Sequence, residues 1–256
     1  MSEPLLKAAN VSIRFGGLTA LTGFNLEIHK GDLQGLIGPN GAGKTTAFNV
    51  LTGVYLPTTG DVFAGSTKLN GRRPHQINRF GLARTFQNIR LFKQSTVLDN
   101  VRVGIRAKSG WVASLLQTPA FNAEEDAIEK RARELLEVMG LSHRVDEFAK
   151  NLPYGEQRRL EIARALGTQP KVLLLDEPAA GMNTREKADL MVLIRELRQR
   201  FELGILVIEH DMKLVMGICE KLTVLDHGET IASGDPENAV RAVEEHMAWA
   251  AANLTG

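Results

Sequence analysis

The sequence is poor in cysteine, and its charges nearly cancel. The single cysteine, Cys219, excludes an internal disulfide, suits a reducing compartment and is expected to be an ordinary, partly buried residue. The formal net charge of +1 contrasts with the basic excess of domains that bind nucleic acid, so we expect no nucleic-acid partner. The histidines are scattered without metal-ligand spacing, so we expect no zinc or iron site.

Long apolar runs and an N-terminal targeting segment are also missing. No run approaches the roughly 18 residues that a membrane span requires. The first residues, Met1–Pro4, lack the basic and apolar regions of a signal peptide. We therefore expect a soluble, cytosolic protein whose link to any membrane comes through a partner. A chain of 256 residues is long enough to bury a large core, as one elaborate domain or as two lobes.

One glycine-rich segment has a specific pattern. Residues 38–45 match the phosphate-binding loop G-x-x-x-x-G-K-[ST], with an apolar run before them and helical spacing after them. Glycines let the backbone turn its N–H groups toward phosphate oxygens, and the following helix adds a favourable dipole. The loop predicts nucleotide binding, with Lys44 at the β- and γ-phosphates and the Thr45 hydroxyl on Mg²⁺. The residues expected to contact the nucleotide here are Gly38, Pro39, Asn40, Gly41, Ala42, Gly43, Lys44, Thr45 and Thr46.

A second acidic motif follows the apolar run Val172–Leu175. This run ends in Asp176 and Glu177, which is a Walker B pattern. The pattern predicts that Asp176 holds Mg²⁺ through its water shell and that Glu177 polarises a water aimed at the γ-phosphate. Acidic pairs at strand ends are often only solvated, but the phosphate loop upstream and Pro178 downstream favour the functional interpretation.

Strand and helix patterns alternate on both sides of a helical middle region. Continuous apolar runs at 172–175, 205–208 and 222–225 predict parallel strands buried on both faces, and the alternation predicts a doubly wound α/β core. Further strands are expected at residues 5–13, 24–28, 61–64, 67–69 and 82–86.

The middle, at about residues 90–160, is expected to be helical. Asn122 and Glu125 form a capping-box pattern, and the helix behind them ends at Gly140. A short amphipathic helix around Trp111, stopped at Pro119, either packs on its own lobe or faces a membrane or partner.

Residues 236–256 predict one helix, whose apolar stripe either packs on the core or forms a dimer contact. That stripe comprises Val240, Val243, Met247, Ala250 and Leu254.

Further motifs complete the pattern of a known family. They are Arg-Thr-Phe-Gln at 84–87, Leu-Pro-Tyr-Gly-Glu-Gln-Arg-Arg at 152–159, Leu-Asp-Glu-Pro at 175–178 and Ile-Glu-His-Asp at 208–211. With the phosphate loop, they resemble the ABC-transporter ATPases in order and spacing over roughly residues 5–235. The resemblance implies a P-loop NTPase (RecA-like) α/β core with an antiparallel β subdomain and an inserted helical subdomain. The implied divisions are a discontinuous nucleotide-binding core at 1–90 and 160–235, a helical subdomain at 91–159 and a C-terminal helix at 236–256.

The resemblance also implies roles for individual residues. Gln87 would link Mg²⁺ and the attacking water to the helical lobe, His210 would contact the γ-phosphate, and Glu177 would act as the base. Phe15 lies where the family stacks a ring on adenine, with a core aromatic as the alternative. The implied cofactors are ATP and Mg²⁺, and the implied metal-binding residues are Thr45, Gln87 and Asp176.

The signature motif departs from the usual L-S-G-G-Q. Pro153 stands in place of the serine and has neither a hydroxyl nor an N–H, so the serine contact to a partner's γ-phosphate is absent. Tyr154, Gly155 and Glu156, with a helix beginning near Gln157, are then expected to contact nucleotide across a dimer. These departures, with the D-loop Ala-Ala-Gly-Met-Asn at 179–183, resemble the ATPases of branched-chain amino acid importers, particularly the longer of their two ATPases.

The function implied by this resemblance is the ATP-hydrolysing motor subunit of a branched-chain amino acid importer. Implied partners are a second ATPase subunit, identical or paralogous, in a nucleotide-sandwich dimer, integral-membrane permease subunits and, indirectly, a periplasmic binding protein. The chain would then sit on the cytoplasmic face of the cell membrane. The alternatives are a non-transport ABC ATPase, typically with two nucleotide domains or a long coiled coil, and a regulatory nucleotide-binding module, typically without Glu177 or His210. The sequence has neither mark.

Overall fold

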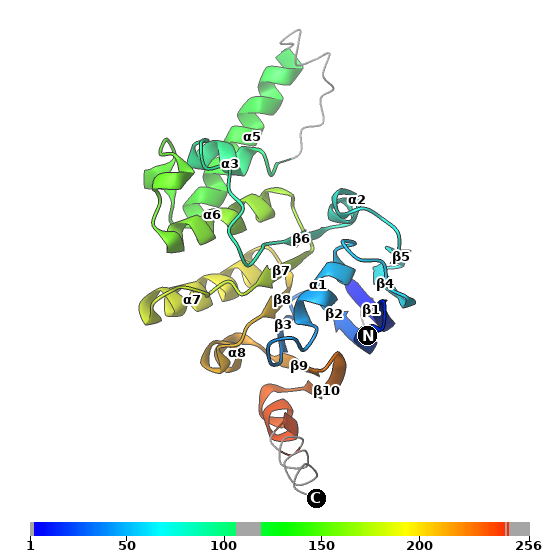
Figure 1. Ribbon diagram of the computed structural model, residues 1–256. Coiled ribbons are helices and arrows are strands. Elements are labelled where there is room, and N and C mark those ends of the chain that lie inside the picture. Colours follow the sequence, from blue (N-terminus) through cyan, green and yellow to red (C-terminus); the bar gives the residue numbers. More distant parts are fainter. Residues whose placement is uncertain (1–2, 106–118, 244, 246–256) are drawn as a thin grey trace, which may run out of the picture.

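The computed structural model describes residues 3–105, 119–243 and 245, and it contains two β-sheets and a lobe of helices (Figure 1). The smaller sheet is antiparallel, with the strand order β2-β1-β4-β5. Its strands are β1 (Leu6–Phe15), β2 (Leu18–Ile28), β4 (Thr59–Ala64) and β5 (Thr67–Lys68). The first two strands are longer than predicted because a two-residue glycine turn joins them directly, with Gly16 at φ 58° and Phe15 paired with Leu18.

The larger sheet has the order β10-β9-β3-β8-β7-β6 and is parallel except at β10. Every residue of β3, β7 and β8 is buried, as the continuous apolar runs within β7 and β8 predict. The strand predicted to reach residue 86 leaves the sheet after Arg84. The strands are β3 (Leu33–Ile37), β6 (Leu82–Arg84), β7 (Val172–Asp176), β8 (Gly204–Ile208), β9 (Lys221–Asp226) and β10 (Glu229–Gly234), of which sequence patterns missed β10.

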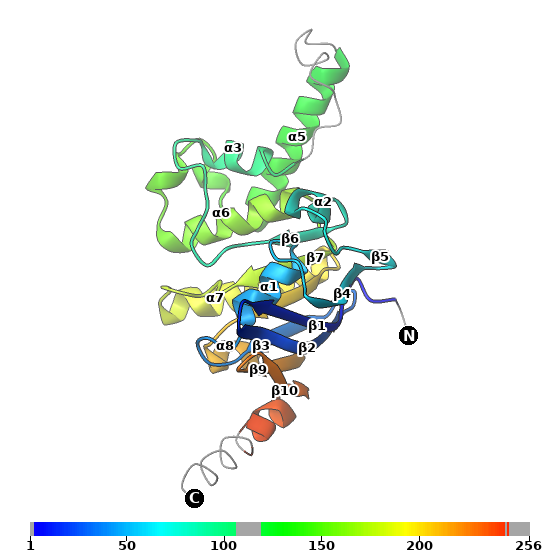
Figure 2. The same cartoon turned by 45° about the vertical axis from the view of Figure 1, so that its right-hand side comes forward.

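Side chains that alternate along the buried strands divide the core into two parts. Leu174 of β7 packs with the antiparallel sheet and α1 (Lys44–Leu51). Leu173 and Leu175, on the opposite face of the same strand, pack with α7 (Thr184–Arg200) and α8 (Met212–Ile218). Because successive side chains of a strand point to opposite faces, each face of the parallel sheet is covered by a different layer. The result is three layers with the parallel sheet in the middle (Figures 1 and 2).

The helical lobe lies beyond the β6 side of the sheet, and α5 extends away from it (Figures 1 and 2). The buried faces of the lobe include Leu135 and Leu136, as the helical spacing predicts. The helices and 3₁₀ turns in this part of the chain are α2 (Pro74–Arg79), α3 (Val97–Arg102), α5 (Pro119–Val138), Ser142–Arg144, Ala149–Asn151 and α6 (Tyr154–Gly167).

One prediction for this region needs correction. The capping box at Asn122 is wrong, because α5 already includes Pro119 and places Asn122 inside the helix. The division between residues 159 and 160 remains a prediction; α6 runs across these residues as one continuous helix. The short helix predicted around Trp111 lies outside the described residues.

The C-terminal tail is described only at its start. Residues 236–243 are helical, and the Asp235 side chain accepts a hydrogen bond from the N–H of Asn238 at 3.1 Å, as a helix cap does. Ala239 is buried in the core, and Val243 packs against it. This part of the tail therefore packs on its own core, while the rest of the predicted stripe lies outside the described residues. Within the described ranges, no helix is long and apolar enough to cross a bilayer.

Candidate nucleotide site

The phosphate loop connects β3 to α1, and its glycines are required by its backbone. A Cβ on Gly38, at φ 150°, would lie 2.1 Å from the main-chain oxygen of Leu225 on β9. Gly43, at φ 100°, would meet a β2 carbonyl at 2.7 Å. At Gly41, φ is 85° and the space beside the residue is open. The loop is thus pressed against two strands on one side and open on the other, which suits a bound phosphate.

Lys44 extends its side chain back along the loop. Its Nζ donates to the carbonyl oxygens of Gly38 at 2.7 Å and Pro39 at 2.9 Å. Burial lowers the pKa of Lys44, while the nearby carboxylates of Glu177 and Asp176 act in the opposite direction. The loop therefore encircles a buried positive charge close to two carboxylates.

Asp176 ends β7 and is buried, whereas Thr45 is exposed in the first turn of α1. Nη2 of Arg84, at the end of the neighbouring strand β6, donates to Oδ2 of Asp176 at 2.7 Å. No hydrogen bond to Oδ1 of Asp176 is found among the described residues. Sequence reasoning quoted Arg84 only as part of a motif and missed this contact, because the two residues lie far apart in the chain.

Gln87, Glu177 and His210 come together although they follow three different strands. Nε2 of Gln87 donates to Oε2 of Glu177 at 2.8 Å, and Nδ1 of His210 lies 4.0 Å from the same oxygen. Because β6, β7 and β8 are adjacent and parallel, the residues that follow them meet at one edge of the sheet. Glu177 has φ 45°, a conformation uncommon for a side-chain-bearing residue.

Glu209, beside His210, is a further residue that the sequence patterns did not single out. Its side chain is buried, and Oε1 accepts a hydrogen bond from the N–H of Ala179 at 2.9 Å. Burial raises the pKa of Glu209, partly offset by backbone hydrogen bonds. The contact ties the end of β8 to the D-loop after β7.

The signature motif forms the first turn of α6. The helix begins at Tyr154 rather than near Gln157, because Pro153 acts as the N-cap residue and its carbonyl accepts from the N–H of Gln157 at 2.9 Å. The N–H groups of the first helical turn have no intrahelical acceptors, and a helix N-terminus favours anions. The altered signature therefore retains main-chain donors despite its proline.

Signature side chains contact the D-loop region and the helical lobe. Tyr154 is 44% exposed, and a Cβ on Gly181 would lie 3.4 Å from its ring. Gly155 is buried next to Glu186, the third residue of α7. Glu156 is paired with Arg144 at 3.2 Å, so its negative charge is compensated within the lobe.

Phe15 ends β1 and remains 45% exposed. Its ring makes an edge contact with Tyr55, with ring centroids 5.1 Å apart. The exposure does not fit the alternative of an ordinary core aromatic. Nothing in the sequence pattern singled out Tyr55 as its neighbour.

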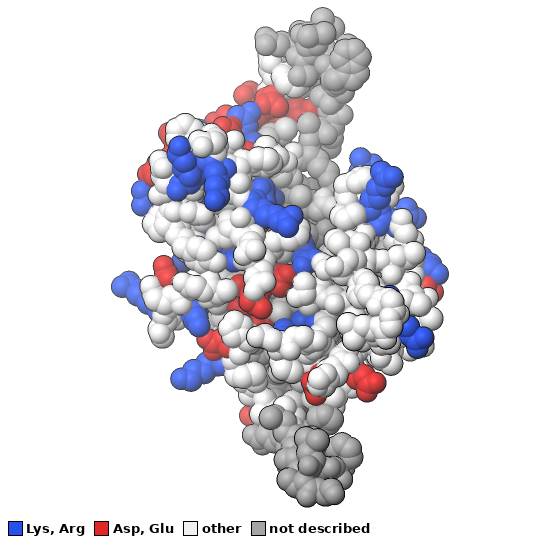
Figure 3. All heavy atoms as spheres, in the orientation of Figure 1, with Lys and Arg blue, Asp and Glu red and all other residues white. Residues whose placement is uncertain are grey.

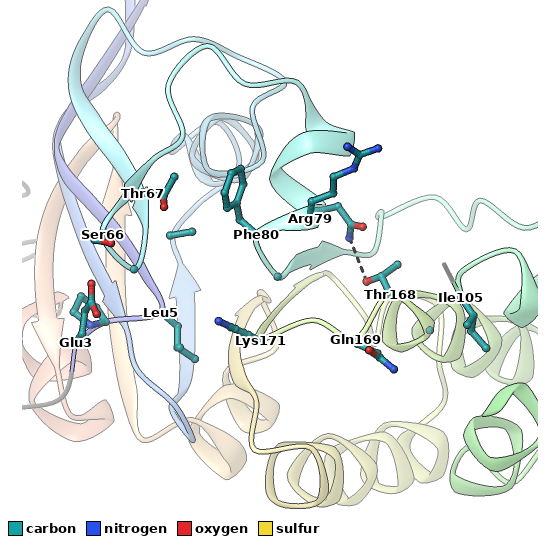
Figure 4. Close-up of a pocket in the computed structure, with 16 residues that line it drawn as sticks. Glu3, Leu5, Ser66, Thr67, Arg79, Phe80, Ile105, Thr168, Gln169 and Lys171 are labelled. Atoms are coloured by element: carbon teal, nitrogen blue, oxygen red, sulfur yellow. Dashed lines mark hydrogen bonds between the residues drawn. The ribbon is translucent and has the colours of Figure 1, made fainter. Parts of the chain in front are cut away.

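A large cavity in the described part of the chain lies elsewhere. It measures about 820 Å³ and opens before the starts of β6 and β7, between Phe80, Lys171 and Thr168 (Figure 4). The Asn78 amide donates to the Thr168 hydroxyl at 3.2 Å beside it. This is the opposite end of the strands from the phosphate loop. The candidate nucleotide site is instead formed around the phosphate loop. On the face of the molecule in Figure 3, basic and acidic side chains are interspersed.

The combined features define an ATP-hydrolysing cassette: a glycine loop opening a helix, carboxylate, glutamine and histidine side chains at adjacent strand ends, and an inserted helical lobe. Residues 21–180 match the family model described as ABC transporter, and the chain belongs to this family.

Curated relatives match nearly the whole chain. It is 48% identical to the high-affinity branched-chain amino acid transport ATP-binding protein LivG of Escherichia coli (strain K12), over 93% of this chain and 94% of that protein. It is 45% identical to the corresponding protein BraF of Pseudomonas aeruginosa, with the same coverage.

Solved structures confirm the predicted fold class. A nucleotide-free ATP-binding cassette from an ABC transporter superposes with a TM-score of 0.80 at 33% identity, covering 94% of this chain and 95% of that chain. A dimeric cassette in a post-hydrolysis state with ADP and Pi gives a TM-score of 0.74 at 25% identity, covering 90% and 98%. The chain is therefore an ABC transporter ATPase and a subunit of a transporter complex.

Proposed function

We propose that this chain is the ATP-hydrolysing subunit of an importer of branched-chain amino acids. The observation that carries the ATPase function is the convergence of Gln87, Glu177 and His210 beside the phosphate loop. The names of the relatives at 48% and 45% identity, together with the altered signature, support the substrate class.

The residues present fit ATP with Mg²⁺. The loop is open at Gly41, and the Lys44 ammonium lies against the loop carbonyls. A positive charge at this place would offset the negative charges of the β- and γ-phosphates. Thr45, Gln87 and Asp176 supply the oxygen donors that Mg²⁺ prefers. When bound, Mg²⁺ neutralises charge that develops on the phosphates.

The side chains at the strand ends then act on water and the γ-phosphate. Glu177 accepts a proton from the attacking water, and the amide of Gln87 holds its carboxylate in place through the 2.8 Å hydrogen bond. His210, whose Nδ1 lies 4.0 Å from the Glu177 carboxylate, would donate to the γ-phosphate. In this mechanism the protein contributes mainly positioning and charge stabilisation, as phosphoryl transfer requires.

A second ATPase subunit, identical or paralogous, completes each site in this proposal. The unpaired N–H groups at the start of α6 would face the γ-phosphate bound by that partner, with Tyr154, Gly155 and Glu156 at the contact. Phe15 would stack on adenine in its own subunit. The exposure of Phe15 and Tyr154 supports both contacts.

Permease subunits are proposed to dock in a groove between the core and the helical lobe. The groove measures about 380 Å³ and is lined by Val54, Phe92 and Val103, which are 51%, 50% and 65% exposed. Phe86, next to Gln87, lines it as well. An apolar loop of a permease seated here would contact the segment that carries Gln87. The periplasmic binding protein would act through the permease.

Reconstituted transport tests the function. Proteoliposomes that contain this chain and the permease subunits encoded beside it, supplied with binding protein, should take up leucine, isoleucine and valine only with ATP. The Glu177→Gln variant, inserted at the same level, should abolish uptake. ATP-driven uptake of another substrate class would overturn the substrate assignment, and an ATPase activity that ignores the permease would overturn the importer role.

A further inference from the structure

Arg158, on α6, has the largest fully buried side chain of the described residues and joins segments more than 70 residues apart in the chain. Its Nη1 donates to the carbonyl oxygen of Phe86 at 2.6 Å, and its Nη2 donates to that of Gln87 at 2.7 Å. The Tyr154 hydroxyl, one turn earlier in α6, accepts from Nη2 at 3.2 Å. One guanidinium thus contacts both the signature turn and the backbone that carries Gln87.

A carboxylate holds this guanidinium in place. Oε2 of Glu161 accepts from Nη1 of Arg158 at 2.8 Å, and the two side chains are 0% and 2% exposed. The other oxygen of Glu161 accepts from the N–H of Arg90 at 3.2 Å. The Arg158–Glu161 pair therefore forms hydrogen bonds with the main chain at both ends of the segment 86–90.

Stability alone is a poor explanation for such a pair. Burying two charges is costly, and replacing a buried ion pair by apolar side chains of similar volume is often neutral or stabilising. The planar guanidinium of Arg158 donates hydrogen bonds to two carbonyl oxygens outside the helical lobe. A hydrophobic side chain has no donors and could not make these bonds. The arrangement specifies where the Gln87 segment lies relative to α6.

We propose that Arg158 is a positioning residue that transmits movement of the signature turn to Gln87; this inference rests on the proposed function. A rigid shift of α6 carries Arg158 with it, and its two hydrogen bonds draw the main chain of residues 86 and 87 along. Because the Gln87 side chain is bonded to Glu177, the shift makes or breaks that contact. Nucleotide held by the partner subunit, touched by Tyr154, is thereby linked to the base in this subunit.

A double-mutant cycle tests the link. Arg158→Met keeps the side-chain length but removes the donors, and Gln87→Ala removes the amide through which Arg158 acts. In the assembled transporter, Arg158→Met should lower kcat roughly tenfold or more, a part of what a positioned base contributes, with the Kd for ATP unchanged. In the Gln87→Ala background, Arg158→Met should have little further effect.

Arg159→Met is the matched control, because Arg159 is the next residue of α6 and, among the residues that the structure describes, makes a single 3.4 Å hydrogen bond, to the carbonyl of Met139. It should leave kcat near wild type. Hydrogen exchange of residues 86–90, measured by mass spectrometry on the nucleotide-free full chain, should rise in Arg158→Met and not in Arg159→Met. If Arg158→Met does not fold, Tyr154→Phe tests the same path, and its loss of kcat should vanish in the Gln87→Ala background.

Multiplicative losses of kcat from Arg158→Met and Gln87→Ala would overturn the inference, because they would mean independent actions. Wild-type kcat in folded Arg158→Met would overturn it as well. A wild-type chain without ATP hydrolysis in the assembled transporter would instead overturn the proposed function, so the two failures are distinguishable.

Discussion

Arg84 and Asp176 form a buried ion pair that joins three elements of the candidate site. Nη2 of Arg84 lies 2.7 Å from Oδ2 of Asp176, with the side chains 8% and 6% exposed. Nη1 of Arg84 donates to Asn49 on α1 at 2.7 Å. The guanidinium also lies over the rings of Phe48 and Phe86, with its carbon 5.3 and 5.2 Å from their centroids. The carboxylate expected near Mg²⁺ is therefore oriented by a side chain from the strand that precedes Gln87.

Removing this partner should destabilise the chain strongly. Arg84→Met leaves Asp176 buried without its cation, and breaking such a pair costs about 3–5 kcal/mol. Urea unfolding followed by circular dichroism measures the change. Arg84→Met combined with Asp176→Asn should recover part of the loss, because no uncompensated charge remains. Equal instability of the single and double variants would contradict a role for the ion pair.

Hydrolysis should depend on Glu177 far more than nucleotide binding does. Glu177→Gln keeps an oxygen for the hydrogen bond from Gln87 but cannot take a proton from water, so turnover should fall about 10²–10⁴-fold with the Kd for ATP nearly unchanged. Lys44→Ala should weaken ATP binding instead, because it removes the charge under the loop. Calorimetry and phosphate release separate the two effects. Near wild-type hydrolysis by Glu177→Gln in the assembled transporter would rule out the base assignment.

A negative charge at the start of α6 should prevent ATP-driven dimerisation. Gly155→Asp would place a carboxylate against a partner's γ-phosphate and beside Glu186, whose Oε1 would lie 3.2 Å from the new Cβ. Gly155→Ala introduces the same Cβ without the charge and is the control. Light scattering in a Glu177→Gln background should show dimers with alanine and monomers with aspartate, while both still bind ATP. Dimers with aspartate would refute the composite site.

Assembly with the permease subunits should require that the groove between the core and the helical lobe stay apolar. Val103→Glu adds a charge at a residue that is 65% exposed, so the isolated chain should keep its stability and ATP affinity. Val192→Glu, at a 51% exposed residue of α7, provides a matched control away from the groove. Co-purification with the permease subunits should be lost only for Val103→Glu. Equal recovery of both variants would argue against docking in this groove.

Asp211 should make stability depend on pH in the acidic range. It caps α8 and its carboxylate lies 2.7 Å from Nζ of Lys187 on α7; this hydrogen bond is the main cause of its lowered pKa. A lowered carboxyl pKa contributes stability that is present above the unfolded value of 3.8 and is lost as pH falls through the folded value.

The matched variant is Asp211→Asn, which retains a cap but loses the charge. Because the pair is partly exposed, the variant should lose only about 0.2–1 kcal/mol at pH 7. The difference from wild type should shrink as the pH falls below the unfolded value of 3.8 and disappear only below the lowered folded pKa. Thermal unfolding at a series of pH values measures it, and a difference that does not shrink as the pH is lowered below 3.8 would contradict the assignment.

Local sequence determined the parts of the site that lie within one continuous segment. The phosphate loop, its preceding strand and the start of α1 follow from glycines and apolar spacing over a few residues. The strand that ends at Asp176 is predictable for the same reason, since a strand buried on both faces must be apolar throughout. The family resemblance added Gln87 and His210, whose own surroundings in sequence carry no such pattern.

Tertiary structure decided the contacts that depend on which strands lie side by side. Arg84 meets Asp176, and Arg158 meets the carbonyl of Gln87, only because β6 pairs with β7 and α6 packs against the segment after β6. Hydrophobic periodicity predicts which face of an element is buried but not its neighbour, since many apolar faces are interchangeable. A buried arginine has few acceptable partners, and the completed fold alone supplies them.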